Sequence, residues 1–164
     1  MNPAPSHTPP AKPLRVLVDA DACPVKEEIY KVALRHKVPV SIVSNSAFRI
    51  PRHDLVRRVV VNDSFDAADD WIAQDADARA VVITGDILLA ERCLKAGAAV
   101  LAHNGKPFDA ANIGGAIATR AIMADLRAGA DGITGGPSAF SKADRSRFLQ
   151  ELDKLLVKLG RSAG

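Results

Sequence analysis

Short runs of apolar residues alternate with amphipathic segments along most of the chain. The apolar runs at 14–19, 39–44, 56–62, 79–86 and 98–102 are rich in β-branched residues and predict buried strands. The segments at 24–37, 65–77, 87–98 and 109–127 show helical spacing of apolar residues. Because strands and helices alternate, the sequence predicts an α/β fold, a three-layer domain with a mainly parallel central sheet.

The two ends of the chain differ in character. The first 13 residues contain five prolines and no apolar run, which predicts a disordered leader over 1–13 and a single domain over 14–164. Ser141 is the predicted N-cap of a final helix, because its hydroxyl can accept a hydrogen bond from the first turn. Apolar residues follow it at helical spacing: Phe148, Leu152, Leu155, Leu156 and Leu159.

Composition disfavours several classes of protein. A chain of 164 residues that is 48% hydrophobic can build a full core, which argues against global disorder. Aromatic residues make up only 4% and the formal charge is +3, which disfavours base-stacking single-strand binders and excludes strongly basic DNA-binding domains. No apolar run approaches the roughly 20 residues that cross a bilayer, and the two cysteines have no zinc-site spacing. We therefore expect a cytoplasmic protein without membrane contact.

Acidic residues stand where two predicted strands end and where one predicted helix begins. The candidate metal ligands are Asp19, Asp21, Asp69, Asp70 and Asp86. In a parallel sheet the carboxyl ends of the strands meet at one edge, where ligands bind. Several carboxylates in one cleft repel one another, and a divalent cation with oxygen ligands removes that penalty. An aspartate set without His or Cys therefore indicates Mg²⁺ or Mn²⁺ and phosphodiester chemistry.

Most of these aspartates also have a structural explanation. Asp86 can cap the helix that follows it, and Asp21 can be a turn residue. Asp69 and Asp70 can complement the dipole of their helix. For any one of these residues taken alone, the structural explanation is favoured. Asp19 differs, because a carboxylate that closes a buried apolar strand requires a compensating partner.

Basic residues gather between the second and third predicted strands and on the third strand. Arg49, Arg52, Arg57 and Arg58 are candidates for contact with the phosphate backbone of a nucleic acid. The alternative is a solvated basic loop that binds nothing.

Several motifs resemble a known family. The segments DADACP at 19–24, FDAADDWI at 65–72 and ITGDILLA at 83–90 resemble the YaiI/YqxD family, a bacterial group that is similar to the PIN-like nucleases. Further similarity lies in FRIPR, NIG and TGGPSAFSKADRSRF, so the resemblance runs from about residue 14 to the end of the chain. It implies a PIN-like fold and a metal-dependent nuclease that acts mostly on RNA.

The resemblance implies catalytic roles for Asp19, Asp69 and Asp86. It also places Asp21 near the metal, with Asp70 as a neighbour. The glutamate that PIN-like enzymes usually carry between the first strand and the helix acid has no clear counterpart, which favours the alternative of a non-catalytic module that binds metal or nucleic acid. A phosphohydrolase of the haloacid dehalogenase type is disfavoured, because its late acidic pair would here precede the threonine of the fourth strand.

Overall fold

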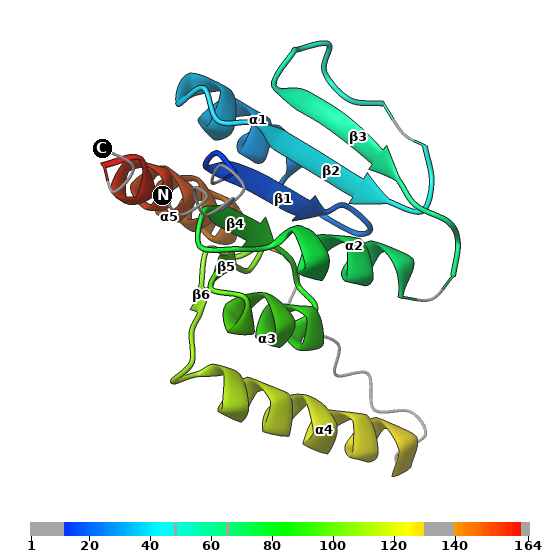
Figure 1. The fold of residues 1–164 in the computed structure, drawn as a ribbon. Helices are drawn as coiled ribbons and strands as arrows, with labels where there is room; N and C mark the ends of the chain where they lie inside the picture. The colour runs from blue at the N-terminus through cyan, green and yellow to red at the C-terminus, as the bar shows by residue number, and fades with distance from the viewer. Residues whose placement is uncertain (1–11, 48, 65, 130–139, 162–164) are drawn as a thin grey trace, which may run out of the picture.

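A computed structural model describes residues 12–47, 49–64, 66–129 and 140–161 of the chain (Figure 1). Its elements in chain order are β1 (Arg15–Asp19), α1 (Lys26–Arg35), β2 (Val40–Ser44), β3 (Val56–Val60), α2 (Ala67–Asp75), β4 (Ala80–Ile83), α3 (Ile87–Lys95), β5 (Ala99–Leu101), β6 (Pro107–Phe108), α4 (Ile113–Gly129) and α5 (Lys142–Arg161). The predicted alternation of strands and helices is confirmed.

The strands form one sheet in the order β3-β2-β1-β4-β5-β6. Strands β1 to β5 run parallel, whereas β6 is antiparallel to β5. The mainly parallel sheet is therefore confirmed. The sequence did not predict β6, since a strand of two residues that begins with proline is too short to show a pattern.

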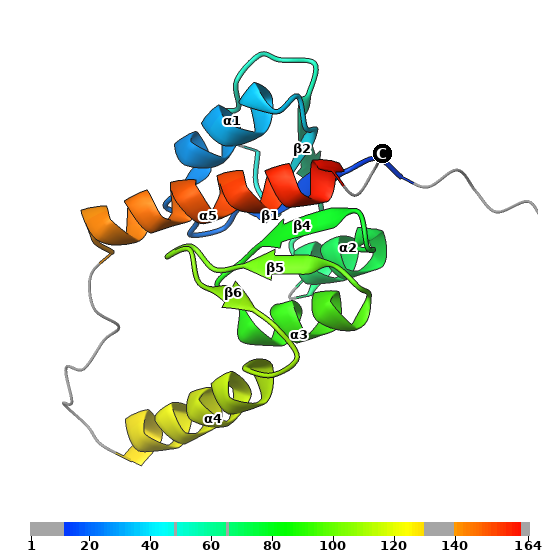
Figure 2. The ribbon, with the colours of Figure 1, turned by 90° about the vertical axis from the view of Figure 1, so that its left-hand side faces the viewer.

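Helices cover both faces of the sheet, as Figure 2 shows for α1 and α5 on one side and α2 and α3 on the other. On the first side, Phe148 of α5 and Ile29 of α1 are buried in one apolar cluster. On the second side, Ile72 of α2 and Leu89 of α3 are buried in another. The predicted three layers are confirmed, and the burial of β1 on both faces explains why its three central residues, Val16, Leu17 and Val18, are all apolar.

The start of β1 is anchored by ion pairs. Arg15 Nε lies 3.0 Å from Asp75 Oδ2, and Arg15 Nη1 lies 3.1 Å from Asp77 Oδ1. Lys12 Nζ lies 2.8 Å from Asp75 Oδ1. The described domain thus includes Lys12, which the sequence assigned to the leader, while residues 1–11 of the predicted leader lie outside the described residues.

Helix α4 lies outermost, beside α3 (Figure 1). It begins at Ile113 and not at 109, because Asp109 and Asn112 exchange hydrogen bonds of 2.9 Å and 2.8 Å between backbone N–H groups and side-chain oxygens. Ile113 is buried against the body, whereas Ile122 and Leu126 are exposed. The core contact of α4 is therefore made mainly by its first turns.

The predicted N-cap of the last helix is confirmed. The backbone N–H of Asp144 donates to Ser141 Oγ at 3.0 Å, and the N–H of Ser141 donates to Asp144 Oδ2 at 3.0 Å. This reciprocal pair is a capping box.

We expect Ser141→Ala to lower the free energy of unfolding by about 1 kcal/mol, which corresponds to a melting temperature about 2–4 °C lower. Thermal unfolding followed by circular dichroism measures the change. Ser146→Ala, at an exposed position of α5, is the control and should stay within about 0.5 kcal/mol of the wild type. Equal losses in both variants would contradict the capping role.

Candidate metal centre

Asp19 ends β1 at the carboxyl edge of the sheet, near its middle. Its Oδ2 accepts a hydrogen bond of 2.9 Å from the hydroxyl of Thr84, a fully buried residue that follows β4. Burial and, to a lesser extent, the charges of Asp69, Asp21 and Asp86 together raise the pKa of Asp19 to about 6, against the opposing effect of this hydrogen bond. The fold thus brings four aspartates from three parts of the chain within electrostatic range.

Asp21 lies in an exposed turn directly after β1, as its structural explanation predicted. The next residue, Ala22, has a φ of +59°, in the left-handed region that turns require. Asp21 Oδ1 accepts a hydrogen bond of 2.9 Å from the hydroxyl of Ser44, a buried residue at the end of β2. The neighbouring strand therefore orients this carboxylate.

Asp86 is the N-cap of α3, as predicted. Its Oδ1 accepts hydrogen bonds from the backbone N–H groups of Leu88 at 2.9 Å and Leu89 at 3.3 Å. The N–H of Asp86 donates to Thr84 Oγ1 at 3.0 Å, while the same hydroxyl donates to Asp19. The hydroxyl of Thr84 therefore connects the last residue of β1 with the N-cap of α3.

Asp69 and Asp70 lie in the first turn of α2. Burial raises the pKa of Asp69, the charges of Asp86 and Asp66 raise it further, and Arg92 opposes the change. Asp70 Oδ1 forms an ion pair of 3.0 Å with Arg92 Nη2. Of these two residues, Asp69 therefore interacts electrostatically with the other site aspartates, whereas Asp70 forms an ion pair with α3.

The carboxylate oxygens of these aspartates are suitable ligands for a hard cation, although they do not form a preformed metal site. Among the described residues, no three His, Cys, Asp or Glu side chains are placed so that they could hold a metal ion. The hydrogen bonds described above use one carboxylate oxygen each of Asp19, Asp21 and Asp86, namely Oδ2, Oδ1 and Oδ1. Oxygen ligands of this kind suit Mg²⁺ or Mn²⁺. Holding one ion would require these side chains to rotate toward each other.

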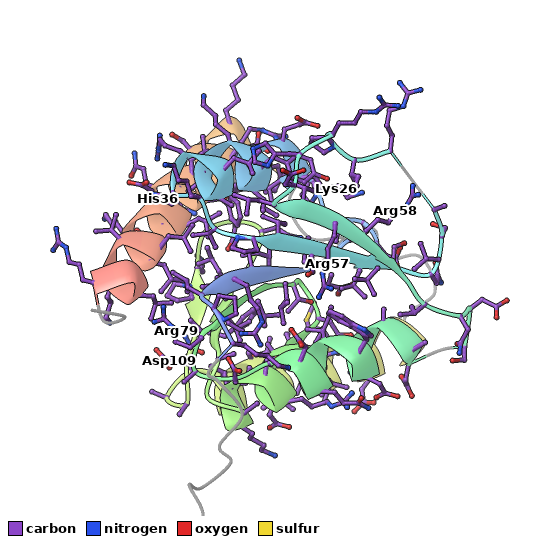
Figure 3. The ribbon with its side chains drawn as sticks, turned by 45° about the horizontal axis from the view of Figure 1, so that its top comes forward. Lys26, His36, Arg57, Arg58, Arg79 and Asp109 are labelled. Atoms are coloured by element: carbon purple, nitrogen blue, oxygen red, sulfur yellow. The ribbon has the colours of Figure 1, made fainter. Side chains whose placement is uncertain are left out.

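The two arginines of β3 point to opposite faces of the sheet, because side chains alternate along a strand (Figure 3). Arg57 Nε donates a hydrogen bond of 2.9 Å to Ser41 Oγ, and its guanidinium carbon lies 5.7 Å from the ring centroid of Trp71 in α2. Arg57 is therefore on the side of the sheet that α2 covers, and Arg58 is on the other side.

Arg49 and Arg52 are exposed in the segment that precedes β3. Their closeness to Arg57 and Arg58 in the sequence suggested a shared role in binding phosphates. Arg57 and Arg58 lie on opposite faces of the sheet, and contact of the four arginines with nucleic acid stays a prediction.

Sequence reasoning missed two residues that shape the site. Ser44 supports Asp21 across 23 positions of the chain. The ring of His103, in the turn after β5, lies beside Gly85, where a Cβ would come within 3.3 Å of its Cε1 atom. Neither contact leaves a local signal in the sequence, because each depends on how distant strands are placed.

Comparison with known sequences adds a family and no activity. A family model described as "Uncharacterized BCR, YaiI/YqxD family" matches residues 17–158. A UPF0178 protein of Sphingopyxis alaskensis is 68% identical over 146 residues, which are 89% of this chain and 95% of that protein. A UPF0178 protein of Jannaschia sp. is 57% identical over 145 residues, 88% of this chain and 93% of the relative.

A third UPF0178 protein, from Rhodopseudomonas palustris strain BisB5, is 53% identical over 149 residues, 91% of this chain and 90% of the relative. No solved structure is a match. Within the part of the chain that the structure describes, no helix is both long and apolar enough to cross a membrane. The family model and these relatives, each matched over most of its length, show that the chain belongs to the YaiI/YqxD family.

Proposed function

We propose that this protein is a divalent-metal-dependent nuclease that hydrolyses RNA phosphodiesters at the aspartates around Asp19. One observation carries the proposal: Asp21, Asp69 and Asp86 all raise the pKa of the half-buried Asp19, which has only the hydroxyl of Thr84 as a hydrogen-bond partner among the described residues. A divalent cation would relieve this repulsion. The resemblance to PIN-like nucleases at the same positions supports the assignment.

In this proposal Asp19, Asp69 and Asp86 are the catalytic residues and hold one or two cations, with Asp21 as a further ligand. Asp70 would contribute negative charge, since its carboxylate already has an ion pair. A bound Mg²⁺ or Mn²⁺ supplies Lewis acidity and lowers the pKa of an attacking water. The water oxygen bonds to phosphorus as the bond to the 3′ oxygen breaks. The attacking water gives up a proton and the 3′ oxygen takes one up, which leaves 5′-phosphate and 3′-hydroxyl ends.

Exposed arginines on and before the edge strand β3 are the proposed contacts for a phosphate backbone. Arg57 is exposed on the α2 side of β3, and Arg49, Arg52 and Arg58 add positive charge near that edge of the sheet. Phosphate contacts release counterions, so we expect RNA binding to weaken as salt increases. Cys23 and Cys93 are both free, which agrees with a proposed role in the cytoplasm.

A non-catalytic module that binds metal or RNA is the second candidate. It is favoured by the absence, among the residues the structure describes, of three side chains already placed to hold an ion. The two candidates differ in turnover, so an experiment that measures metal binding and cleavage together separates them.

Asp86→Asn tests the proposal without removing the cap of α3, because asparagine caps helices about as well as aspartate. We expect the wild type to cleave single-stranded RNA in Mn²⁺ and not in EDTA. The variant should lose at least about 10-fold in rate at an unchanged melting temperature, since it loses a charged ligand. Gel analysis of end-labelled RNA, with Mn²⁺ titrated by calorimetry, gives both quantities.

Asp54→Asn, at an exposed position outside the cluster, is the matched control and should cleave at the wild-type rate. Binding of Mn²⁺ without cleavage of any RNA tested would support the non-catalytic module. A protein that binds neither Mn²⁺ nor RNA and cleaves no RNA would contradict both candidates.

A further inference from the structure

A cavity of about 580 Å³ opens directly beside the aspartate site. Gly85, which separates Thr84 from Asp86, lies on its wall, and the turn after β5 contributes His103 and Lys106. Its volume lies within the range of about 300–1,000 Å³ that is typical of small-molecule sites. The cavity therefore has room for a small ligand, and Gly85 places its wall next in sequence to Asp86.

Two glycines give the cavity its shape. A Cβ at Gly85 would come within 3.3 Å of the ring of His103, so the glycine lets this ring lie against the end of β4. A Cβ at Gly105 would lie 2.7 Å from backbone atoms of Arg147 and Phe148, so this glycine lets the turn pack against α5. The walls are thus held by one close contact with a side-chain ring and one with the backbone of α5.

The lining combines aromatic rings with positive charge. Phe108 of β6 and Phe140 before α5 supply apolar surface. Lys106 is exposed, Arg147 of α5 also lines the cavity, and Asp144 adds one carboxylate to the lining. Among the described residues, Arg147 Nη1 donates to Asn104 O and to Asp144 Oδ1 at 3.3 Å each, and the guanidinium carries further N–H groups.

One polar atom of the lining is buried without a partner. His103 Nε2 is inaccessible to solvent and makes no hydrogen bond to any described residue. Burial lowers the pKa of this imidazole. A buried polar atom of this kind is costly unless a ligand or water pairs with it.

We infer that this cavity holds one nucleotide of the single-stranded substrate, with its phosphate at Lys106 and Arg147 and its base against Phe108, Phe140 and His103. The inference rests on the proposed nuclease function, because it places the nucleotide next to the phosphodiester at the aspartates. Cations bind the phosphate, and aromatic rings bind the face of any base. Phosphate alone would use only the first of these contacts.

Binding of adenosine 5′-monophosphate in EDTA tests the inference separately from catalysis. Calorimetry should show that the wild type binds this nucleotide more tightly than inorganic phosphate or adenosine. Lys106→Gln should weaken binding about 5–10-fold, since it removes one charged contact. Lys95→Gln is the control, because it removes the same charge from an exposed position at the far end of α3.

Three outcomes would overturn the inference. The first is nucleotide binding that is no tighter than phosphate binding, and the second is no nucleotide binding at all. The third is an equal loss of nucleotide affinity in Lys106→Gln and Lys95→Gln. Cleavage in Mn²⁺ that depends on Asp86 would then still support the nuclease. Nucleotide binding without any cleavage would keep the cavity and reject the nuclease.

Discussion

Asp19→Asn should abolish Mn²⁺-stimulated RNA cleavage and, in metal-free buffer at pH 8, melt at a higher temperature than the wild type. Asparagine has nearly the same shape, and its side-chain oxygen can accept the hydrogen bond from Thr84. It lacks the negative charge that Asp21, Asp69 and Asp86 repel. Loss of a direct ligand should reduce the cleavage rate by at least about 100-fold, since even residues behind the ligands are worth about 10–100-fold.

The gain in stability should depend on pH in a defined direction. The pKa of Asp19 is about 6 in the folded protein and 3.8 without the fold, so between these values the folded state binds more protons than the unfolded state. The wild type therefore loses stability as the pH rises through this window. Asp19→Asn does not lose stability in this way. Its extra stability relative to the wild type should therefore be complete above pH 6 and vanish near pH 4. We expect it to reach about 1–2 kcal/mol after allowance for solvent screening.

Thermal unfolding of both proteins from pH 4 to 8 in EDTA measures this difference. Asp54→Asn, which removes a carboxylate outside the cluster, should show no such pH-dependent gain. Added Mn²⁺ should raise the melting temperature of the wild type and leave that of Asp19→Asn unchanged, because only the wild type would bind the ion. An Asp19→Asn protein that unfolds easily yet keeps wild-type Mn²⁺ affinity would show that Asp19 is structural.

The architecture could be predicted because its signals are local. The run that contains Val16, Leu17 and Val18 is buried on both faces, and a strand buried in this way is continuously apolar. The caps at Asp86 and Ser141 were also predictable, since each acts on N–H groups within three residues of itself. Once the strands were assigned as parallel, the ends of β1 and β4 had to meet at one edge.

The finer geometry of the site depends on contacts between distant parts of the chain. The pairing of Asp21 with Ser44 requires β2 to lie next to β1, and no pattern within either strand indicates it. Arg57 and Arg58 illustrate a different limit. Their nearness in the sequence made both candidates for phosphate contact, whereas adjacent positions of a strand must face opposite sides. Strand periodicity therefore outweighs sequence proximity when residues are grouped into a site.

Gly105→Ala should lower the free energy of unfolding by about 2–4 kcal/mol, because it combines an unfavourable backbone conformation with a collision. The φ of Gly105 is +85°, and an added Cβ would lie 2.7 Å from the carbonyl carbon of Arg147 and from the backbone nitrogen of Phe148. Both atoms belong to the backbone of α5, so neither can move aside as a flexible side chain would.

Two other glycines separate these causes. Gly97 has a φ of +91°, but a Cβ there would meet nothing closer than 3.7 Å, so Gly97→Ala should cost only the conformational part, about 1 kcal/mol. Gly115 lies in α4 with nothing within 4 Å of the added Cβ, so Gly115→Ala should stabilise the protein by up to about 1 kcal/mol. Urea unfolding of the three variants gives the comparison. Equal costs at Gly97 and Gly105 would mean that backbone conformation alone requires glycine at Gly105, and that close packing of its turn against α5 contributes nothing to stability.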